Sequence, residues 1–151
     1  MIAALLALVM PAIGAAGPTR LTWRESAVLA DLNRMRARYG RLPLRIDPRL
    51  VRAARHRTDS IVGTGAFDHG RFWLWVKREG ITSGQVGETL GWRVPVNGAE
   101  SWVVAMWMRS PEHRAILLDP VYQAVGIGVR LAAFKGYRNA FVVTAEYRGA
   151  A

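Results

Sequence analysis

Apolar residues recur every three or four positions in the first part of the chain, which is the period of an amphipathic helix. Thr22 and Glu25 form a capping-box pattern before this run, and Gly40 after it is a natural C-terminal stop. We therefore predict a helix between these two signals. Its apolar stripe comprises Val28, Leu29, Leu32 and Met35, and its polar positions include Arg34, Arg36 and Arg38.

A second helix is predicted to begin at Asp47-Pro48, because aspartate is a good N-cap and proline is tolerated at the first helical position. Gly63 and Gly65 mark its end. His56 lies off the apolar stripe of this helix, so we expect it on the surface. The stripe itself comprises Leu50, Ala54 and Ile61.

Three more helices are predicted in the middle of the chain. Phe72–Glu79 is rich in aromatic residues and suits a short helix. The stretch Glu100–Met108 is apolar nearly all round, so we expect a helix at the centre of the fold. Ser110 then caps a helix that has Pro111 at its first position, and Asp119-Pro120 ends that helix.

Two strands are predicted near the C-terminus, over Val125–Val129 and Phe141–Tyr147, with Lys135–Asn139 as the hairpin loop between them. Gly87–Trp92 suits a short strand or an extended turn. Gly126-Ile127-Gly128 places two glycines on one face, which indicates close approach of a helix or ligand. Both faces of the strands are largely apolar and need cover. The order of elements predicts an α+β domain in which helices flank a small antiparallel sheet.

The length of 151 residues and the N-terminal sequence indicate one exported domain. Met1–Gly17 has no charged residue, and its apolar run Met1–Met10 is followed by small residues that permit cleavage after Ala16. We predict a signal peptide over 1–16 and one domain over 20–151, in a secreted or periplasmic protein. An uncleaved membrane anchor is the alternative, although a membrane span needs about 20 apolar residues.

The formal net charge of +10 comes almost entirely from arginine, since Lys77 and Lys135 are the only lysines. Such a surface suits anionic lipid, acidic wall polymers or nucleic acid, and a solvated basic surface without such a partner is the alternative. Export disfavours nucleic acid and leaves an anionic envelope surface as the expected partner. The chain has no cysteine, which excludes disulfides, thiolate metal sites and a cysteine nucleophile.

His69, Glu88 and His113 are the candidate residues for chemistry. His113 falls in the first turn of its predicted helix, where the helix dipole favours a neutral imidazole. Two imidazoles and a carboxylate could bind zinc with an open fourth position, or act as acid and base; separate structural hydrogen bonds are the alternative. The spacing contains no local metal motif such as His-x-x-x-His. A glycoside hydrolase would need a second acid near Glu88, for which Glu112 and Glu146 are candidates.

Six short segments occur in an order and spacing that resemble a known family. They are Leu32-Asn33-Arg34-Met35-Arg36, Leu42-Pro43-Leu44, Phe67-Asp68-His69, Gly87-Glu88-Thr89-Leu90, Trp107-Met108-Arg109-Ser110-Pro111-Glu112-His113-Arg114 and Gly126-Ile127-Gly128-Val129. Together they resemble the CAP superfamily in its bacterial, SCP-like form. This superfamily includes cysteine-rich secretory proteins, wasp-venom antigens and plant pathogenesis-related proteins. The segment from Trp107 to Arg114 is the most specific part of the resemblance.

The resemblance implies a secreted three-layer α–β–α sandwich with a cleft lined by two histidines and acidic residues. Carried over to this chain, the cleft residues are His69, Glu88 and His113. Animal members have a second cleft glutamate where this chain has Ser110, and Thr89 replaces their usual asparagine. These departures favour ligand binding over catalysis. Ser110, as the helix cap, and the neighbouring Trp107 are expected to have structural roles.

The leading hypothesis is an exported, monomeric protein of the cell envelope that binds a lipid or another small ligand in this cleft. Some cleft histidines of the family are associated with divalent metal, so His69 and His113 are the expected zinc ligands. One alternative is a hydrolase of wall, peptide or ester bonds that uses zinc-bound water or Glu88 as the base. Another is a purely electrostatic binder of the envelope or of nucleic acid. A shared metal requires the two imidazoles to lie within about 8 Å of each other.

Overall fold

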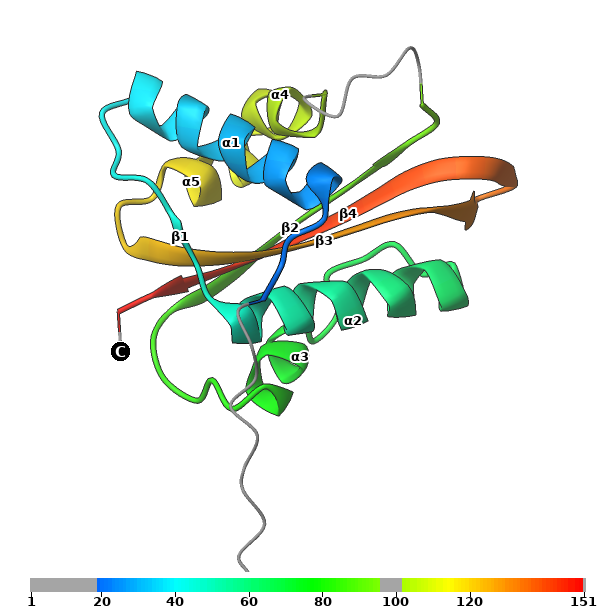
Figure 1. Cartoon of the computed structure of the whole chain (residues 1–151), viewed down its shortest axis with the longest axis horizontal. Helices are drawn as coiled ribbons and strands as arrows, with labels where there is room; N and C mark the ends of the chain where they lie inside the picture. The colour runs from blue at the N-terminus through cyan, green and yellow to red at the C-terminus, as the bar shows by residue number, and fades with distance from the viewer. Residues whose placement is uncertain (1–18, 96–101, 151) are drawn as a thin grey trace, which may run out of the picture.

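A helical layer, a sheet and a second helical layer make up the computed structural model, which describes residues 19–95 and 102–150 (Figure 1). The helices are α1 (Trp23–Arg38), α2 (Pro48–Thr64), α3 (Trp73–Arg78), α4 (Trp102–Arg109) and α5 (Pro111–Leu118). The strands are β1 (Arg45–Ile46), β2 (Val86–Arg93), β3 (Tyr122–Phe134) and β4 (Tyr137–Gly149). This arrangement confirms the predicted α+β sandwich. The signal peptide predicted over residues 1–16 lies outside the described residues.

The sheet has the strand order β1-β3-β4-β2, so β2 is an edge strand. β4 pairs antiparallel with both β3 and β2, and the two-residue β1 pairs parallel with β3. The β3–β4 hairpin is longer than predicted, because the turn consists of Lys135 and Gly136, which both have positive φ. The predicted loop through Asn139 was therefore too long, since β4 already begins at Tyr137.

Helices α1, α4 and α5 cover one face of the sheet and enclose the larger hydrophobic core (Figure 1). As predicted, α4 is central, because its Trp107 is fully buried and donates a hydrogen bond to the carbonyl of Leu90 over 2.8 Å. The buried core of this layer includes Val28, Leu32, Val103, Trp107, Leu117, Val125, Ile127 and Tyr147. Among the helices of residues 19–95 and 102–150, we find none with both the length and the apolarity to cross a membrane.

Helices α2 and α3 cover the opposite face, and α2 lies directly on the two glycines of β3. A β-carbon on Gly126 would overlap the backbone carbonyl of Leu50, and one on Gly128 would lie 2.5 Å from the carbonyl oxygen of Ala54. Side chains at these two positions would therefore push the helix off the sheet. The prediction that a helix approaches this glycine pair is confirmed.

Arg36 is the clearest departure from the predicted pattern of α1. It was assigned to the polar positions of the helix, but its side chain is buried, with 1 % of the residue exposed. Its guanidinium donates hydrogen bonds only to backbone carbonyls, which compensate for its desolvation. The acceptors are the carbonyl oxygens of Leu42, Leu117, Asp119 and Tyr122, at 2.6–3.2 Å. Arg36 thus joins the end of α1 to the end of α5 and the start of β3.

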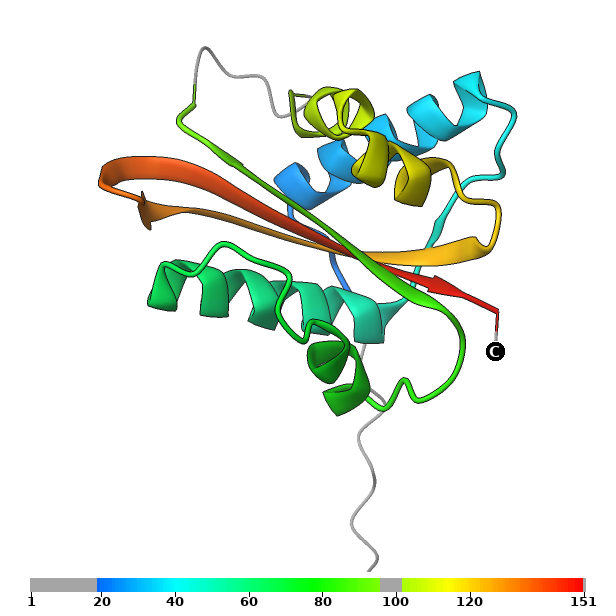
Figure 2. The ribbon, with the colours of Figure 1, turned by 180° about the vertical axis from the view of Figure 1, so that it is seen from behind.

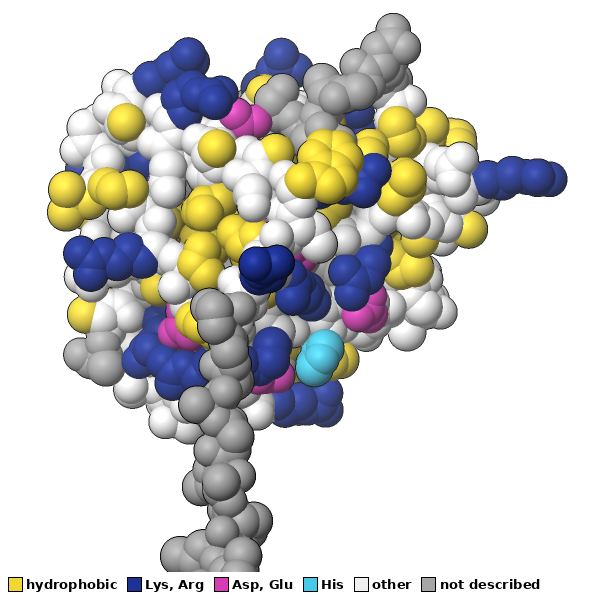
Figure 3. Space-filling view, in the orientation of Figure 1, with side chains coloured by type: hydrophobic (Ala, Val, Ile, Leu, Met, Phe, Trp, Pro, Cys, Tyr) yellow, Lys and Arg dark blue, Asp and Glu magenta, His cyan; other side chains and the backbone are white. Residues whose placement is uncertain are grey.

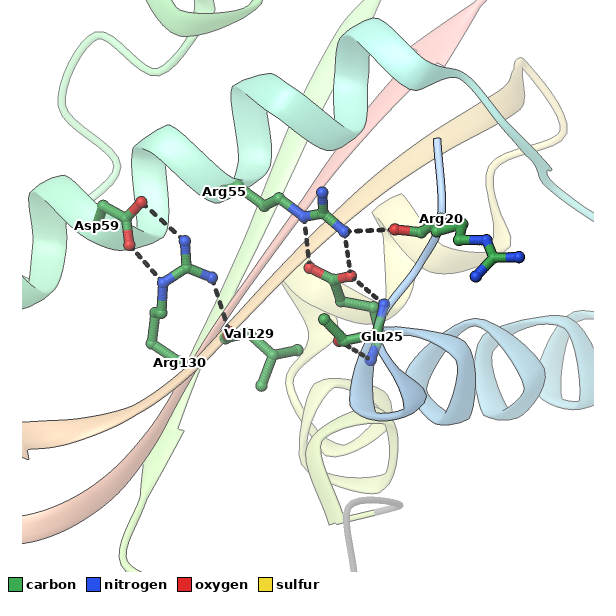
Figure 4. A network of polar contacts seen from close by, with 7 residues as sticks. Arg20, Glu25, Arg55, Asp59, Val129 and Arg130 are labelled. Atoms are coloured by element: carbon green, nitrogen blue, oxygen red, sulfur yellow. Dashed lines mark hydrogen bonds and ion pairs between the residues drawn. The ribbon is translucent and has the colours of Figure 1, made fainter. Parts of the chain in front are cut away.

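An ion pair between the buried Glu25 and the partly exposed Arg55 connects the start of α1 with α2 on the other side of the sheet (Figure 4). Glu25 is fully buried and accepts two hydrogen bonds from Arg55, at 2.8 and 2.6 Å. Burial alone would raise the pKa of Glu25, but the bonds from Arg55 and from the Thr22 amide hold that pKa below its ordinary value. The predicted capping box of Thr22 and Glu25 is confirmed, and it also carries this contact between the layers.

Replacing Gly126 by alanine should destabilise the domain by about 3 kcal/mol, because the new methyl group meets the rigid backbone of Leu50 and Val51 and not a movable side chain. Gly63 lies in α2 with open space around it, so Gly63→Ala is the matched control and should stabilise by about 0.5–1 kcal/mol. Urea unfolding of both variants measures the difference. Equal stability of Gly126→Ala and the wild type would contradict the close packing described above.

Candidate functional site

The three predicted site residues meet at the edge strand β2. His69 lies in the loop between α2 and α3, Glu88 lies on β2, and His113 lies in the first turn of α5. Figure 2 shows β2 in front, with α5 on one side of it and the loop after α2 on the other. The two imidazole rings are 6.2 Å apart between centroids and are tilted by 60°. The structure therefore brings together side chains from both helical layers.

Glu88 is the buried centre of this group, with 2 % of the residue exposed. Its Oε1 lies 2.8 Å from His69 Nδ1, and its Oε2 accepts a hydrogen bond from Arg57 Nε over 3.0 Å. Arg57 also donates to the carbonyl oxygen of Asp68, next to His69 in the loop. Because a carboxylate only accepts hydrogen bonds, His69 donates through Nδ1, and its Nε2 is not used in this bond.

Arg57 is a site residue that the sequence analysis missed. It extends the stripe of Leu50, Ala54 and Ile61 on the buried face of α2. That helical spacing was the available signal, since an arginine within an apolar stripe needs an acidic or carbonyl partner. Here the partner is Glu88, and the pair is buried, with side-chain exposures of 9 % for Arg57 and 0 % for Glu88.

Glu146 lies directly opposite Glu88 in the pairing of β2 with β4. It is fully buried, and its carboxyl oxygens have no hydrogen-bond partner among the described residues. Burial raises the pKa of Glu146 well above its ordinary value, and the negative charge of Glu88 raises it further. Both effects favour the protonated form of Glu146. The other candidate acid, Glu112, is exposed on α5.

The two histidines have opposite protonation tendencies. The hydrogen bond to Glu88 raises the pKa of His69, even though partial burial opposes this shift. Burial lowers the pKa of His113, and the charge of nearby His69 lowers it further. Both effects favour the neutral form that was predicted for His113. Ser110 caps α5 as predicted, with its hydroxyl 3.5 Å from the amide nitrogen of His113.

The imidazole rings are close enough to contact one small ligand or ion. With metal–nitrogen bonds of about 2.0–2.1 Å, two imidazoles that share an ion place their centroids roughly 5 Å apart at a tetrahedral angle and roughly 6.5 Å apart when the two bonds are nearly collinear. The separation of 6.2 Å between His69 and His113 falls in this range. Among the residues that the structure describes, no group of three or more histidine, cysteine or acidic residues is arranged around a metal position. Glu88 is bonded to Arg57 and His69.

The model of the family described as "CAP: Cysteine-rich secretory protein family" matches residues 29–147. The chain is 30% identical over 118 residues to the uncharacterized protein YkwD of Bacillus subtilis. The aligned region covers 74% of this chain and 44% of that relative. The chain therefore spans less than half the length of this curated relative.

Solved structures with low sequence identity share the fold. A cysteine-rich secretory protein from Staphylococcus aureus matches with a TM-score of 0.66 and 19% identity, over 84% of this chain and 38% of that one. An extracellular protein with an SCP domain from Bacillus anthracis gives 0.67 and 17%, over 88% and 45%. An outer surface protein from Borrelia burgdorferi gives 0.67 and 17%, over 83% and 92%.

The hydrogen bond to Glu88 makes the titration of the two histidines distinguishable. In an NMR titration, His69 should titrate above the ordinary value of 6.5 and His113 below it. Glu88→Gln should lower the pKa of His69 towards 6.5, since the amide no longer favours the imidazolium.

The same bond predicts the sign of a pH effect on stability. The folded-state pKa of His69 is raised, so protonated His69 stabilises the fold. Its contribution to the free energy of unfolding is complete below pH 6.5 and is lost as the pH rises through the raised pKa, which urea unfolding at a series of pH values measures. In the NMR titration, identical midpoints for the two wild-type histidines would contradict the hydrogen bond between His69 and Glu88. An unchanged His69 midpoint in Glu88→Gln would contradict it as well.

Proposed function

The chain belongs to the cysteine-rich secretory protein (CAP) family, and from this premise we propose an exported envelope domain that binds its ligand at the imidazole pair of His69 and His113. The pair is the observation on which the proposal depends. Both rings are only partly buried, they lie 6.2 Å apart, and one is held by a buried carboxylate. A ligand placed between them would meet nitrogen atoms of both rings, of which the His69 ring is held in place by Glu88.

The proposed ligand is a divalent metal ion, with zinc as the leading candidate. Nε2 of His69 and one ring nitrogen of His113 would hold it, and Glu88 would fix the tautomer and orientation of His69. Two protein ligands leave coordination positions for the polar group of a lipid or another small molecule. Bound zinc would supply a Lewis acid that polarises such a group.

The same geometry gives less support to hydrolysis. A general base must reach the substrate, but Glu88 is only 2 % exposed, and its two oxygens contact Arg57 and His69. Glu146, the second carboxyl group nearby, is fully buried behind Glu88. Ser110 occupies the position where the animal proteins have an additional acid. We therefore favour a binding module over an enzyme.

Export is proposed on two grounds. The first is the uncharged, apolar Met1–Gly17 stretch, which resembles a secretory signal. The second is that structurally similar proteins are described as extracellular or as outer surface proteins. The net charge of +10 would then hold a monomeric protein near the anionic surface of the envelope.

Zinc calorimetry tests the metal site. Wild-type protein should bind one zinc ion, whereas His69→Ala and His113→Ala should each weaken binding by at least about tenfold, because each removes one of only two protein ligands. His56→Ala removes an exposed histidine of α2 and is the matched control, which should bind as the wild type does. Equal zinc binding by all four proteins would eliminate the site.

A chelator experiment separates binding from hydrolysis. We expect no turnover of ester, peptide or wall-polymer substrates that depends on metal or on Glu88, because Glu88 is buried and bonded to Arg57 and His69. The screen compares wild type, Glu88→Gln and His56→Ala with and without chelator. Turnover that is lost with chelator and in Glu88→Gln, but kept in His56→Ala, would favour the hydrolase instead.

A further inference from the structure

One end of the molecule exposes large apolar side chains from two neighbouring loops. Leu42, in the connection from α1 to β1, is 82% exposed, and Tyr39 in the same connection is 45% exposed. Val121, in the connection from α5 to β3, is 36% exposed. Both connections lie at the left end of the molecule in Figure 1, and at the right end when it is turned in Figure 2. We call this surface the loop end.

Arginines surround these apolar side chains. Arg38, Arg41, Arg45 and Arg114 are all exposed at the loop end, and no ion pair with a carboxylate is found for them among the described residues. The guanidinium of Arg114 lies 4.8 Å from the ring centroid of Tyr39, which places α5 against the end of α1. Figure 3 shows basic and hydrophobic side chains next to each other along this edge.

The charged and apolar groups form one continuous surface. One hollow is lined by Arg41 and Arg114 together with Leu118 and Pro120. A second hollow, of about 480 Å³, is lined by Leu42, Arg45, Tyr122 and the same Pro120. The cations and the apolar side chains are therefore interleaved on both sides of Pro120.

The buried Arg36 fixes the relative position of the two connections. Its guanidinium bonds the carbonyl of Leu42 on one side and those of Asp119 and Tyr122 on the other. The backbone segments that carry the exposed side chains of Leu42 and Val121 are thus both hydrogen-bonded to Arg36. A surface that is ordered before binding loses less conformational entropy when a partner arrives.

We propose that the loop end docks on an anionic lipid bilayer. The arginines would lie among the lipid phosphates, while Leu42, Val121 and Tyr39 would enter the boundary between headgroups and acyl chains. A soluble polyanion would bind the arginines but would gain little from an 82% exposed leucine between them. This docking is independent of what the imidazole pair binds, because it uses other side chains at another part of the molecule.

The absence of cysteine in the chain permits a site-specific test. The full-length protein carries one new cysteine, Leu42→Cys or the control Leu131→Cys, labelled with the environment-sensitive dye NBD. Leu131 is a matched control because it is 45% exposed on β3, away from the loop end. Vesicles of equal parts phosphatidylglycerol and phosphatidylcholine should shift NBD emission to the blue at position 42 and leave it unchanged at position 131.

Charge variants test the role of the arginines. The triple variant Arg38→Gln, Arg41→Gln and Arg114→Gln should bind these vesicles on the order of 100-fold more weakly, since each cation contributes about fivefold. The matched control removes the same charge from exposed positions elsewhere, in the triple variant Arg71→Gln, Lys77→Gln and Arg138→Gln. Its loss of vesicle affinity should be about tenfold smaller than that of the first triple variant. Pure phosphatidylcholine vesicles measure any contribution of the apolar N-terminal segment, which all variants share.

Three results would overturn the proposal. The first is an NBD shift at position 131 that equals the shift at position 42. The second is an equal loss of binding in the two triple variants. The third is unchanged vesicle binding in Leu42→Ser together with full competition by inorganic polyphosphate, because the partner would then be a soluble polyanion. Unfolding curves of every variant establish that the fold is retained.

Discussion

The contact between the backbone of α2 and the two glycines of β3 is the constraint that positions the site. Because Gly126 and Gly128 have no side chains, α2 lies against the sheet with Leu50 and Ala54 at van der Waals distance from β3. This closeness brings Arg57, one turn after Ala54, to the carboxylate of Glu88 on the far edge strand. A packing feature of the centre of the sheet thereby determines the chemistry at its edge.

Burial of charge determines the rest of the site. Two carboxyl groups face each other across β2 and β4, and only one of them, Glu88, has a cation to compensate for its desolvation. Glu146 forms no ion pair among the described residues, and its burial raises its pKa well above the ordinary value. The hydrogen bond to Glu88 raises the pKa of His69, whereas burial lowers the pKa of His113 and the neighbouring His69 lowers it further.

Local sequence signals predicted the helices and strands well, because caps and apolar periodicity act over a few residues. The caps Thr22, Asp47 and Ser110 are all observed. Arg36 and Arg57 were not predicted as buried, since their partners lie far along the chain and only the tertiary fold brings them close. The grouping of His69, Glu88 and His113 likewise depended on the family resemblance, because residue spacing alone carried no metal motif.

The position of the two histidines has a mechanical consequence. His69 follows α2 in one layer, whereas His113 begins α5 in the other, and the sheet between them ends at β2. Any ligand that bonds to both rings would link the two helical layers at the β2 edge of the sheet and would resist movement of one layer relative to the other. Ligand binding at the imidazole pair would then also raise the free energy of unfolding of the whole domain.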